Sequence, residues 1–306
     1  MKVAIVNGAN GFVATGLIPE LVRSRIHVIA IVRSAASIDK DSYLRKPGVT
    51  LVEGELESLY LKIKPILDDG SNENCVFYNC VWSGGAGLTD GGIGAQMDNV
   101  VRSTELVKLA SSLGCGRFVN IGSAEEDQME DYLKTDWRKL PYPYSHSDYA
   151  VAKLSARDQG RLEGYLSKID YIHTRFSSAL SMNLTGKGYI QDTVKNILNK
   201  KGYSEPNSGA LFNIISREDL SRALVCIGKY GKNQANYFIG YDYAVTLKDL
   251  FQFLKRVVDS KGTLGEDRFG LKKSKSPFLE YSCIKRDCIF DFSDDLEEFL
   301  KGLVGI

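Results

Sequence analysis

The chain has 306 residues, enough to bury a large core as one large domain or two smaller ones, and its formal net charge of +1 gives no electrostatic basis for binding nucleic acid or an anionic membrane. Its six cysteines are scattered without a C-x-x-C pair and its three histidines do not cluster, so we expect reduced thiols and neither a disulfide framework nor a metal site. The N-terminus enters a strand directly and no apolar run approaches transmembrane length, so we expect a cytoplasmic protein without a signal peptide.

The chain begins with a pattern typical of dinucleotide binding. Residues 2–6 form an apolar run of the kind buried in parallel sheets, and a helical pattern follows over 13–24. Between them, Gly8 permits a tight turn, Gly11 lets the backbone approach a pyrophosphate, and Ala14 allows close helix packing. The helix N-terminus then faces the phosphates, although a plain turn between strand and helix is the alternative. The residues expected to contact the cofactor are Gly8, Asn10, Gly11, Phe12 and Val13.

The end of the second strand, over 27–32, indicates which cofactor is bound. NAD-binding sheets often carry an acidic residue here that bonds the adenosine ribose, but this chain has Arg33. A guanidinium suits a 2′-phosphate, so NADP(H) is favoured and NAD(H) remains possible. The alternative is that Arg33 stacks on adenine or faces solvent. A third strand over 49–52 places Glu55 and Leu56 to reach the adenine.

Two further strands lead toward a ligand. The fourth, over 75–81, runs into a glycine-rich stretch over 84–94 that could fold over a ligand or form a surface loop. A helix over 97–113 then leads to the fifth strand, over 117–123. Ser123 lies at the carboxyl end of that strand, where ligands bind in open α/β sheets.

Tyr149 and Lys153 stand four residues apart in a helical pattern over 149–166, so the two side chains share one helical face. A free phenol has a pKa of about 10 and exchanges protons poorly near neutrality. A neighbouring ammonium favours the phenolate and lowers the pKa of the phenol toward working pH. The pair is therefore a candidate for acid–base chemistry, although a Tyr-x-x-x-Lys spacing also occurs on solvated helices.

The recurrence of strand, glycine turn and helix predicts an α/β fold with a doubly wound parallel sheet of the Rossmann type. We expect residues 1–175 to form the dinucleotide-binding domain, ending with a strand over 170–175. Residues 176–306 are expected to form a smaller C-terminal α/β substrate-binding cap, with some elements interleaved with the first domain. The elements expected after residue 175 are helices over 186–201, 217–228, 246–260 and 294–303 and strands over 211–215 and 236–239.

Taken together, these features resemble the extended short-chain dehydrogenase/reductase family, and within it the NAD-dependent epimerase/dehydratase group that acts mostly on nucleotide sugars. The resemblance covers nearly the whole chain. It is carried by the Gly8-Gly11-Ala14 turn, NVVRST over 99–104, RFV over 117–119 before Ser123, Tyr149-x-x-x-Lys153, Arg175, ISREDL over 215–220, YFIG over 237–240 and TLKDL over 246–250.

The resemblance implies roles for particular residues. Tyr149 would exchange a proton with the substrate carbonyl, Lys153 would lower the pKa of Tyr149 and bond the nicotinamide ribose, and Ser123 would hydrogen-bond the reacting oxygen. The further cofactor-binding residues implied are Asn79, Cys80, Val81 and Asn99, and the substrate-binding residues are Ser83, Ser123, Ala124, Glu125 and Ser178.

Departures from the family pattern concern the substrate. Dehydratases of the family carry an acidic pair directly after the position of Ser123, whereas Ala124-Glu125 offers one carboxylate. This argues against sugar 4,6-dehydration, which needs both an acid and a base. Ser178 stands where many members have an Asn near the sugar pyrophosphate, and the family's Tyr-Gly-Pro after it is missing.

We therefore expect an NAD(P)-dependent oxidoreductase that reduces the keto group of a nucleotide-linked sugar, with Tyr149 as proton donor. The alternatives are a nucleotide-sugar 4-epimerase with tightly held NAD, a reductase of a non-sugar carbonyl compound, and a catalytically silent dinucleotide-sensing protein. Arg33 favours the reductase, because an epimerase never needs to exchange with the reduced NADP pool.

The resembled family also implies a homodimer, in which the helices over 97–113 and 149–166 pair with their copies as a four-helix bundle. Apolar and small side chains at helical spacing favour such packing here. The residues expected at this interface are Leu106, Leu109, Leu113, Ala152, Ala156 and Leu162.

Overall fold

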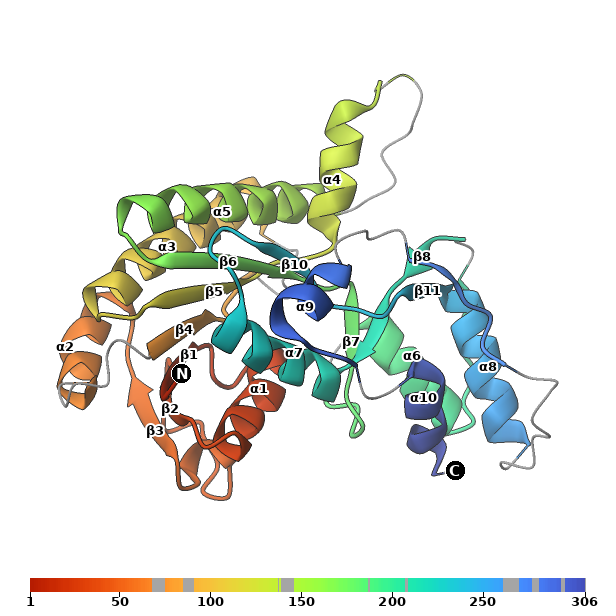
Figure 1. Cartoon of the computed structure of the whole chain (residues 1–306). Coiled ribbons are helices and arrows are strands. Elements are labelled where there is room, and N and C mark those ends of the chain that lie inside the picture. The colour runs from red at the N-terminus through yellow and green to blue at the C-terminus, as the bar shows by residue number, and fades with distance from the viewer. Residues whose placement is uncertain are drawn as a thin grey trace. The chain divides into compact units, whose positions relative to one another are not determined.

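The computed structural model describes residues 1–67, 75–84, 91–136, 138, 146–186, 188–206, 209–260, 270–276, 281–292 and 295–305 (Figure 1). The chain divides into two compact units, which are described separately below. The first unit comprises Met1–Arg175 and Leu224–Tyr237, and the second comprises Phe176–Ala223 and Phe238–Ile306.

A seven-stranded sheet in the order β10-β6-β5-β4-β1-β2-β3 organises the first unit. Strands β1 to β6 pair in parallel, which confirms the predicted doubly wound sheet. From the edge strand β3 the chain returns to β4 beside β1, so the strand order reverses between β1 and β4, the place where open α/β sheets bind ligands. The strands are β1 (Val3–Asn7), β2 (His27–Val32), β3 (Val49–Glu53), β4 (Cys75–Asn79), β5 (Arg117–Ile121), β6 (Asp170–Arg175) and β10 (Asn236–Phe238).

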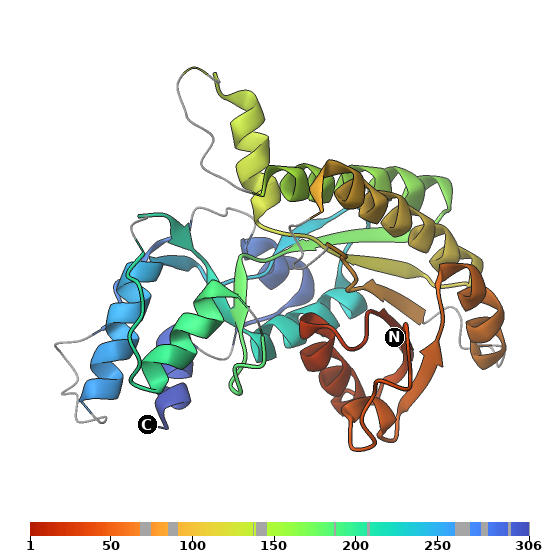
Figure 2. The ribbon, with the colours of Figure 1, turned by 180° about the vertical axis from the view of Figure 1, so that it is seen from behind.

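Helices cover both faces of this sheet (Figures 1 and 2). One face carries α2 (Leu56–Leu67), α3 (Gly92–Ser112) and α5 (Ser147–Leu166); the other carries α1 (Phe12–Arg23) and the C-terminal part of α7 (Arg217–Tyr230). Successive side chains of a strand point to opposite faces. Accordingly, Phe77 of β4 packs with apolar residues of α2 and α3, whereas the hydroxyl of Tyr78 donates to the Leu224 carbonyl of α7 at 3.3 Å.

A row of stacked rings crosses three adjacent strands beneath α3 and α5. The ring centroids of Phe77 and Phe118 lie 5.4 Å apart, and those of Phe118 and Tyr171 lie 5.9 Å apart. Glycine lets α5 approach this row: a Cβ at Gly160 would lie 2.4 Å from the Tyr171 ring, and one at Gly164 would lie 2.6 Å from the Tyr171 Cβ. The position of α5, which carries Tyr149 and Lys153, therefore depends on two residues without side chains.

Most of the residues that we expected at a homodimer interface are buried within the first unit, so that part of the prediction is wrong. The α3 leucines belong to the core between helices and sheet, and Ala152 and Ala156 of α5 are fully buried within the same unit. The reason is that the leucines face their own sheet, whereas the two alanines pack with Val100 of α3. Of the expected set, only Leu162 is exposed. The apolar side chains that these helices do expose are Ile93, Met97 and Val101 of α3 and Leu162, Tyr165 and Leu166 of α5.

The second unit holds short sheets and several helices (Figure 1). Strand β7 (Ser178–Leu180) pairs in parallel with β9 (Ile214–Ser216), and β11 (Tyr243–Thr246) pairs antiparallel with both its neighbours. The neighbours of β11 are β8 (Leu211–Phe212) and β12 (Ser274–Lys275), and the helices of this unit are α6 (Tyr189–Leu198), α8 (Leu247–Asp259), α9 (Tyr281–Cys288) and α10 (Leu296–Val304).

Several elements differ from the sequence-based expectation. Helix α3 begins at Gly92, earlier than expected, and α2 and α4 (Glu125–Lys134) were not predicted. The strand expected over 211–215 is interrupted at Asn213, whose amide group donates to the carbonyls of Tyr241 and Tyr243 at 2.7 and 2.9 Å. Much of the glycine-rich stretch 84–94 lies outside the described residues. Among the described helices, none is both long and apolar enough to cross a membrane.

Candidate active site

The turn between β1 and α1 has the geometry expected of a pyrophosphate-binding turn. Gly8 has φ of +77°, and a Cβ there would lie 2.7 Å from the Val81 side chain and 3.3 Å from the Cys80 carbonyl. Gly11 is the N-cap of α1, and no side chain in the described part of the chain caps that helix end. A helix N-terminus without a side-chain cap suits an anion. These residues therefore fit the pyrophosphate of a dinucleotide.

The remaining residues expected at the turn surround it. Asn10 is exposed, Phe12 opens α1, and Val13 is half-buried in its first turn. Val81 and Cys80, at the end of β4, lie against Gly8, so the structure brings together two segments expected along the cofactor. Their contact with a cofactor stays a prediction.

The residues expected near the adenosine lie after β2 and β3. Arg33 follows β2 directly and is exposed. Glu53, at the end of β3, accepts a hydrogen bond from the Ala35 N–H at 2.7 Å and so fixes the loop that follows Arg33. Glu55 is exposed, and Leu56 starts α2 and packs against the core, so the segment expected to reach the adenine leads into a helix.

Tyr149 and Lys153 occupy a buried site at the start of α5. Tyr149 is 8% exposed and is hydrogen-bonded to Ser123, and Lys153 is 4% exposed. The Lys153 ammonium donates to the Ile121 carbonyl at 2.9 Å and lies 3.8 Å from the centroid of the Trp82 ring. It lies farther, 5.7 Å, from the centroid of the Tyr149 ring.

Burial controls the ionisation of both residues. It raises the pKa of Tyr149 well above its usual range; the hydrogen bond to Ser123 acts against this, and Glu125 and Glu126 add to it. Burial lowers the pKa of Lys153 to about 8, although the charges of Glu126 and Cys80 raise it. The expected lowering of the Tyr149 pKa by Lys153 is not seen, because the ammonium is turned toward Ile121 and Trp82.

Trp82 is a site residue that the sequence analysis missed. Its ring packs edge-on against Tyr149 with centroids 5.9 Å apart, and its indole N–H donates to Gln96 of α3 at 2.8 Å. Asn99 braces the same loop: its side chain accepts from the Ser83 N–H at 2.8 Å and donates to the Ser83 carbonyl at 2.6 Å. Asn99 and Ser83, expected to bind cofactor and substrate, thus meet each other in the structure.

Asn79 is a structural residue as well as a predicted cofactor contact. It is buried at the end of β4, and its amide donates to Asn120 Oδ1 at 3.0 Å and to Ser103 Oγ at 3.3 Å. Its Oδ1 accepts from the Val81 N–H at 3.3 Å. These bonds hold the end of β4 and its following residue in place.

Ser123 lies in the turn from β5 to α4. Its hydroxyl accepts a hydrogen bond from the Glu125 N–H at 3.3 Å. The Glu125 carboxylate lies 3.4 Å from Nδ1 of His146, and burial raises the pKa of Glu125 while His146 acts against that rise. Ala124 is buried beside them. Ser123, Glu125 and Tyr149 are therefore brought together as expected.

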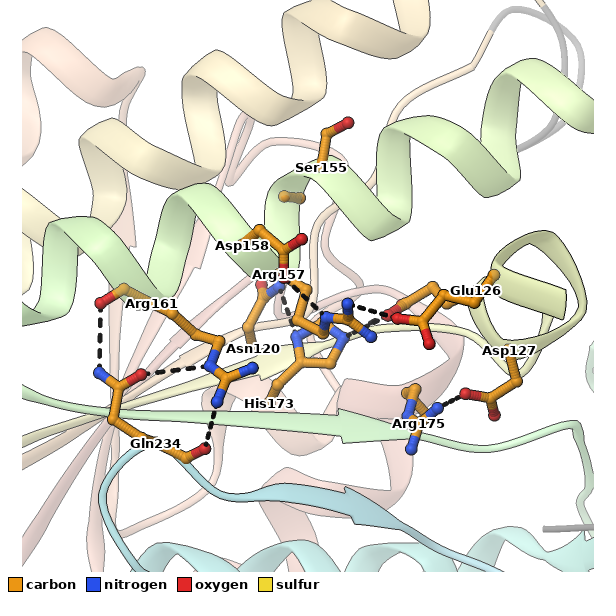
Figure 3. Close-up of polar contacts among 12 residues, drawn as sticks. Asn120, Glu126, Asp127, Ser155, Arg157, Asp158, Arg161, His173, Arg175 and Gln234 are labelled. Carbon is orange, nitrogen blue, oxygen red and sulfur yellow. Dashed lines mark hydrogen bonds and ion pairs between the residues drawn. The ribbon is translucent and has the colours of Figure 1, made fainter. Parts of the chain in front are cut away.

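Two polar side chains, His173 and Arg175, lie beneath this turn, on β6 (Figure 3). His173 is hydrogen-bonded to Glu126, and Arg175 forms an ion pair with Asp127. Ser178 opens β7 in the second unit, where its N–H donates to the Asn213 carbonyl at 3.3 Å, and its role in substrate binding stays a prediction. In the described ranges, no group of three or more His, Cys, Asp or Glu side chains could hold a metal ion.

Comparison with known proteins assigns the chain to a family. Residues 4–240 match the model of the NAD dependent epimerase/dehydratase family. The chain belongs to this family. No curated protein sequence is a significant match. The predicted resemblance is thus confirmed over most of the chain.

Solved structures of similar fold include several family-type enzymes at low sequence identity. UDP-N-acetylglucosamine 4-epimerase from Bacillus cereus has a TM-score of 0.74 and 15% identity, covering 99% of this chain and 96% of its own. UDP-glucuronic acid 4-epimerase from Bacillus cereus, in complex with NAD, has a TM-score of 0.70 and 17% identity, with 98% and 94% covered. WbmH from Bordetella bronchiseptica, in complex with NAD+, has a TM-score of 0.69 and 18% identity, with 100% and 98% covered. The TM-scores show that this member of the epimerase/dehydratase family shares its fold with these proteins.

Proposed function

We propose that this protein is an NAD(P)-dependent oxidoreductase that reduces the keto group of a nucleotide-linked sugar. The observation that carries the proposal is the cluster of half-buried Ser123 with buried Tyr149 and Lys153, at the same edge of the sheet as a glycine turn that fits a dinucleotide. Family membership supports the cofactor class. The similar structures of UDP-sugar epimerases support the substrate class.

The protein's own residues would position the substrate and move one proton. Ser123 would donate a hydrogen bond to the keto oxygen and hold it near the phenol of Tyr149. The phenol of Tyr149 is protonated at neutral pH, as a free phenol is, and can give its proton as charge develops on that oxygen. Lys153 would bond the nicotinamide ribose, and the bound nicotinamide would supply the hydride.

Arg33 supports a preference for NADP(H). Its exposed guanidinium follows β2 directly, at the position where an acidic side chain would select the ribose hydroxyls of NAD. A bidentate contact with a 2′-phosphate would add a charge-assisted bond that NADH cannot make. Exchange with a reduced NADP pool in turn suits a reductase.

A second candidate is a nucleotide-sugar 4-epimerase that keeps NAD bound, and the observation that favours it is the number of epimerases among the similar structures, some of them in complex with NAD. One assay distinguishes the two. Protein mixed with NADPH and a UDP-linked keto-sugar should oxidise NADPH stoichiometrically if it is a reductase. Conversion of a UDP-sugar into its 4-epimer without net change in nicotinamide absorbance would instead identify an epimerase.

We also propose that the second unit supplies further substrate-binding residues, Ser178 among them, and that the protein is a cytoplasmic homodimer. The exposed apolar side chains of α3 and α5, including Val101 and Leu162, support the dimer, because such residues on neighbouring helices are favoured at interfaces.

A further inference from the structure

A buried carboxylate lies directly beneath Ser123. Glu126, in the first turn of α4, is 0% exposed, and its partner His173, on β6, is 1% exposed. Nε2 of His173 lies 2.9 Å from Oε2 and 3.1 Å from Oε1 of Glu126 (Figure 3). A carboxylate removed from water needs compensating partners, so its presence here points to a role in the site above it.

Glu126 holds the main chain of Ser123. The Ser123 N–H donates to Oε1 of Glu126 at 2.8 Å, and the Glu126 N–H donates to the Ser123 carbonyl at 3.2 Å. These two bonds close the turn between β5 and α4. They fix the residue whose side chain is hydrogen-bonded to Tyr149.

Gly122 makes room for the Glu126–His173 pair. A Cβ at this position would lie 2.3 Å from Oε1 of Glu126 and 2.3 Å from Nε2 of His173. Any other residue there would displace one of the two side chains. The glycine immediately before Ser123 is therefore explained by the pair beneath it.

The groups around Nδ1 of His173 set the tautomer of its imidazole. The amide of Asn120 lies 3.4 Å from Nδ1 of His173, and its oxygen is already engaged by the Asn79 amide at 3.0 Å, so the Asn120 NH2 group faces Nδ1. Nδ1 is then an acceptor, with the Tyr171 hydroxyl also 3.4 Å away. The imidazole proton is therefore on Nε2, where it is donated to an ionised Glu126.

The charge of Glu126 reaches the proposed proton-transfer residues. It favours the ammonium form of Lys153 against burial, and it disfavours the phenolate of Tyr149. The ionisable groups that face Glu126 or adjoin it are Lys153 and Tyr149 of α5, His173 and Tyr171 of β6, and Glu125 and Asp127 of its own helix.

We propose that Glu126, held in place by His173, is a positioning residue that orients Ser123 and places a negative charge beneath the start of α5. The proposal rests on the function proposed above, because Glu126 acts only through Ser123 and Lys153. It adds to that function a link, through Glu126, between Ser123 in the turn after β5 and the charge of Lys153 on α5.

Glu126→Gln tests the proposal, because glutamine keeps the shape and an acceptor oxygen but removes the charge. In protein labelled with carbon-13 at lysine Cε, the signal missing from Lys153→Arg identifies Lys153, and its titration needs neither substrate nor cofactor. We expect a midpoint at about pH 8 in the wild type. In Glu126→Gln we expect it about one pH unit lower.

Glu130→Gln is the matched control. It makes the same substitution one turn further along α4, where the carboxylate pairs with Arg157 at 2.5 Å. This variant should leave the Lys153 midpoint and the pH dependence of kcat unchanged. In Glu126→Gln, the pH at which kcat falls on the alkaline side should be lower, by the same amount as the Lys153 midpoint.

An unchanged Lys153 midpoint in Glu126→Gln would overturn the proposal. A lowered midpoint without turnover of any nucleotide sugar would support it and count against the proposed substrate class, so the two failures are distinguishable. If Glu126→Gln does not fold, nitrogen-15 spectra of the three wild-type histidines decide. We expect a slowly exchanging proton on Nε2 of His173, and a proton on Nδ1 would contradict the proposal.

Discussion

Burial raises the pKa of Tyr149 and lowers the pKa of Lys153, the two residues at the start of α5. The raised pKa keeps the phenol of Tyr149 protonated, so a proton is present for a keto oxygen, although this phenol is a weaker acid than free tyrosine. Lys153 has a pKa lowered to about 8, so it is an ammonium below that pH and loses its charge as the pH rises through it. Activity that needs the Lys153 cation should therefore fall on the alkaline side.

Replacing Tyr149 by Phe should lower kcat by about 10²-fold or more, because the variant has no proton to donate. Cofactor binding should be unaffected, since the ring and its packing against Trp82 remain. Stopped-flow turnover and cofactor titration measure the two quantities separately. Near-wild-type turnover would remove Tyr149 from the mechanism.

Replacing Arg33 by Asp should weaken NADPH binding by a few kcal/mol, a factor of about 10² or more in Kd, because an attraction becomes a repulsion. Binding of NADH should change much less. Fluorescence titration of the two reduced cofactors gives both constants. A native protein that binds NADH more tightly than NADPH contradicts the assignment.

At the scale of elements, local sequence predicts some features well and others not at all. The Gly8 turn, β1 and β2 were predicted because glycines and apolar runs mark them directly. Helix α4 was not, because only Glu126 and Met129 of its residues are buried, so no apolar face marks it. The same limit applies to the site: Ser123 and Tyr149 carry motifs, whereas the contact of Glu126 with His173 joins residues 47 positions apart.

The docking of α5 on the sheet can be tested at Gly160. A Cβ there would lie 2.4 Å from the Tyr171 ring, so Gly160→Ala should destabilise the protein by about 1–3 kcal/mol. Gly94→Ala is the matched control, because Gly94 lies in α3 with nothing within 4 Å of its added Cβ. The control should be neutral or stabilising by up to about 1 kcal/mol. Urea denaturation followed by circular dichroism compares the two, and equal midpoints would contradict the packing argument.

At the scale of the whole molecule, the proposed dimer predicts a mass of twice the 33.9 kDa chain in light scattering at micromolar concentration. Val101→Arg, which places a charge on the exposed apolar face of α3, should split that dimer while leaving the fold intact. Leu61→Arg is the control, since Leu61 is equally an exposed apolar residue but lies on α2. A monomeric wild type would exclude the dimer.

The indole of Trp82 gives this protein an internal optical reporter. The chain has two tryptophans, so replacing Trp137 by Phe leaves Trp82 as the only strongly emitting side chain. Its ring lies 3.8 Å from the Lys153 ammonium, and a charge at that distance alters the energy of the excited state. Emission should therefore change with a midpoint at about pH 8 as Lys153 titrates. A flat emission profile through that range would show that the cation does not sit on the indole in solution.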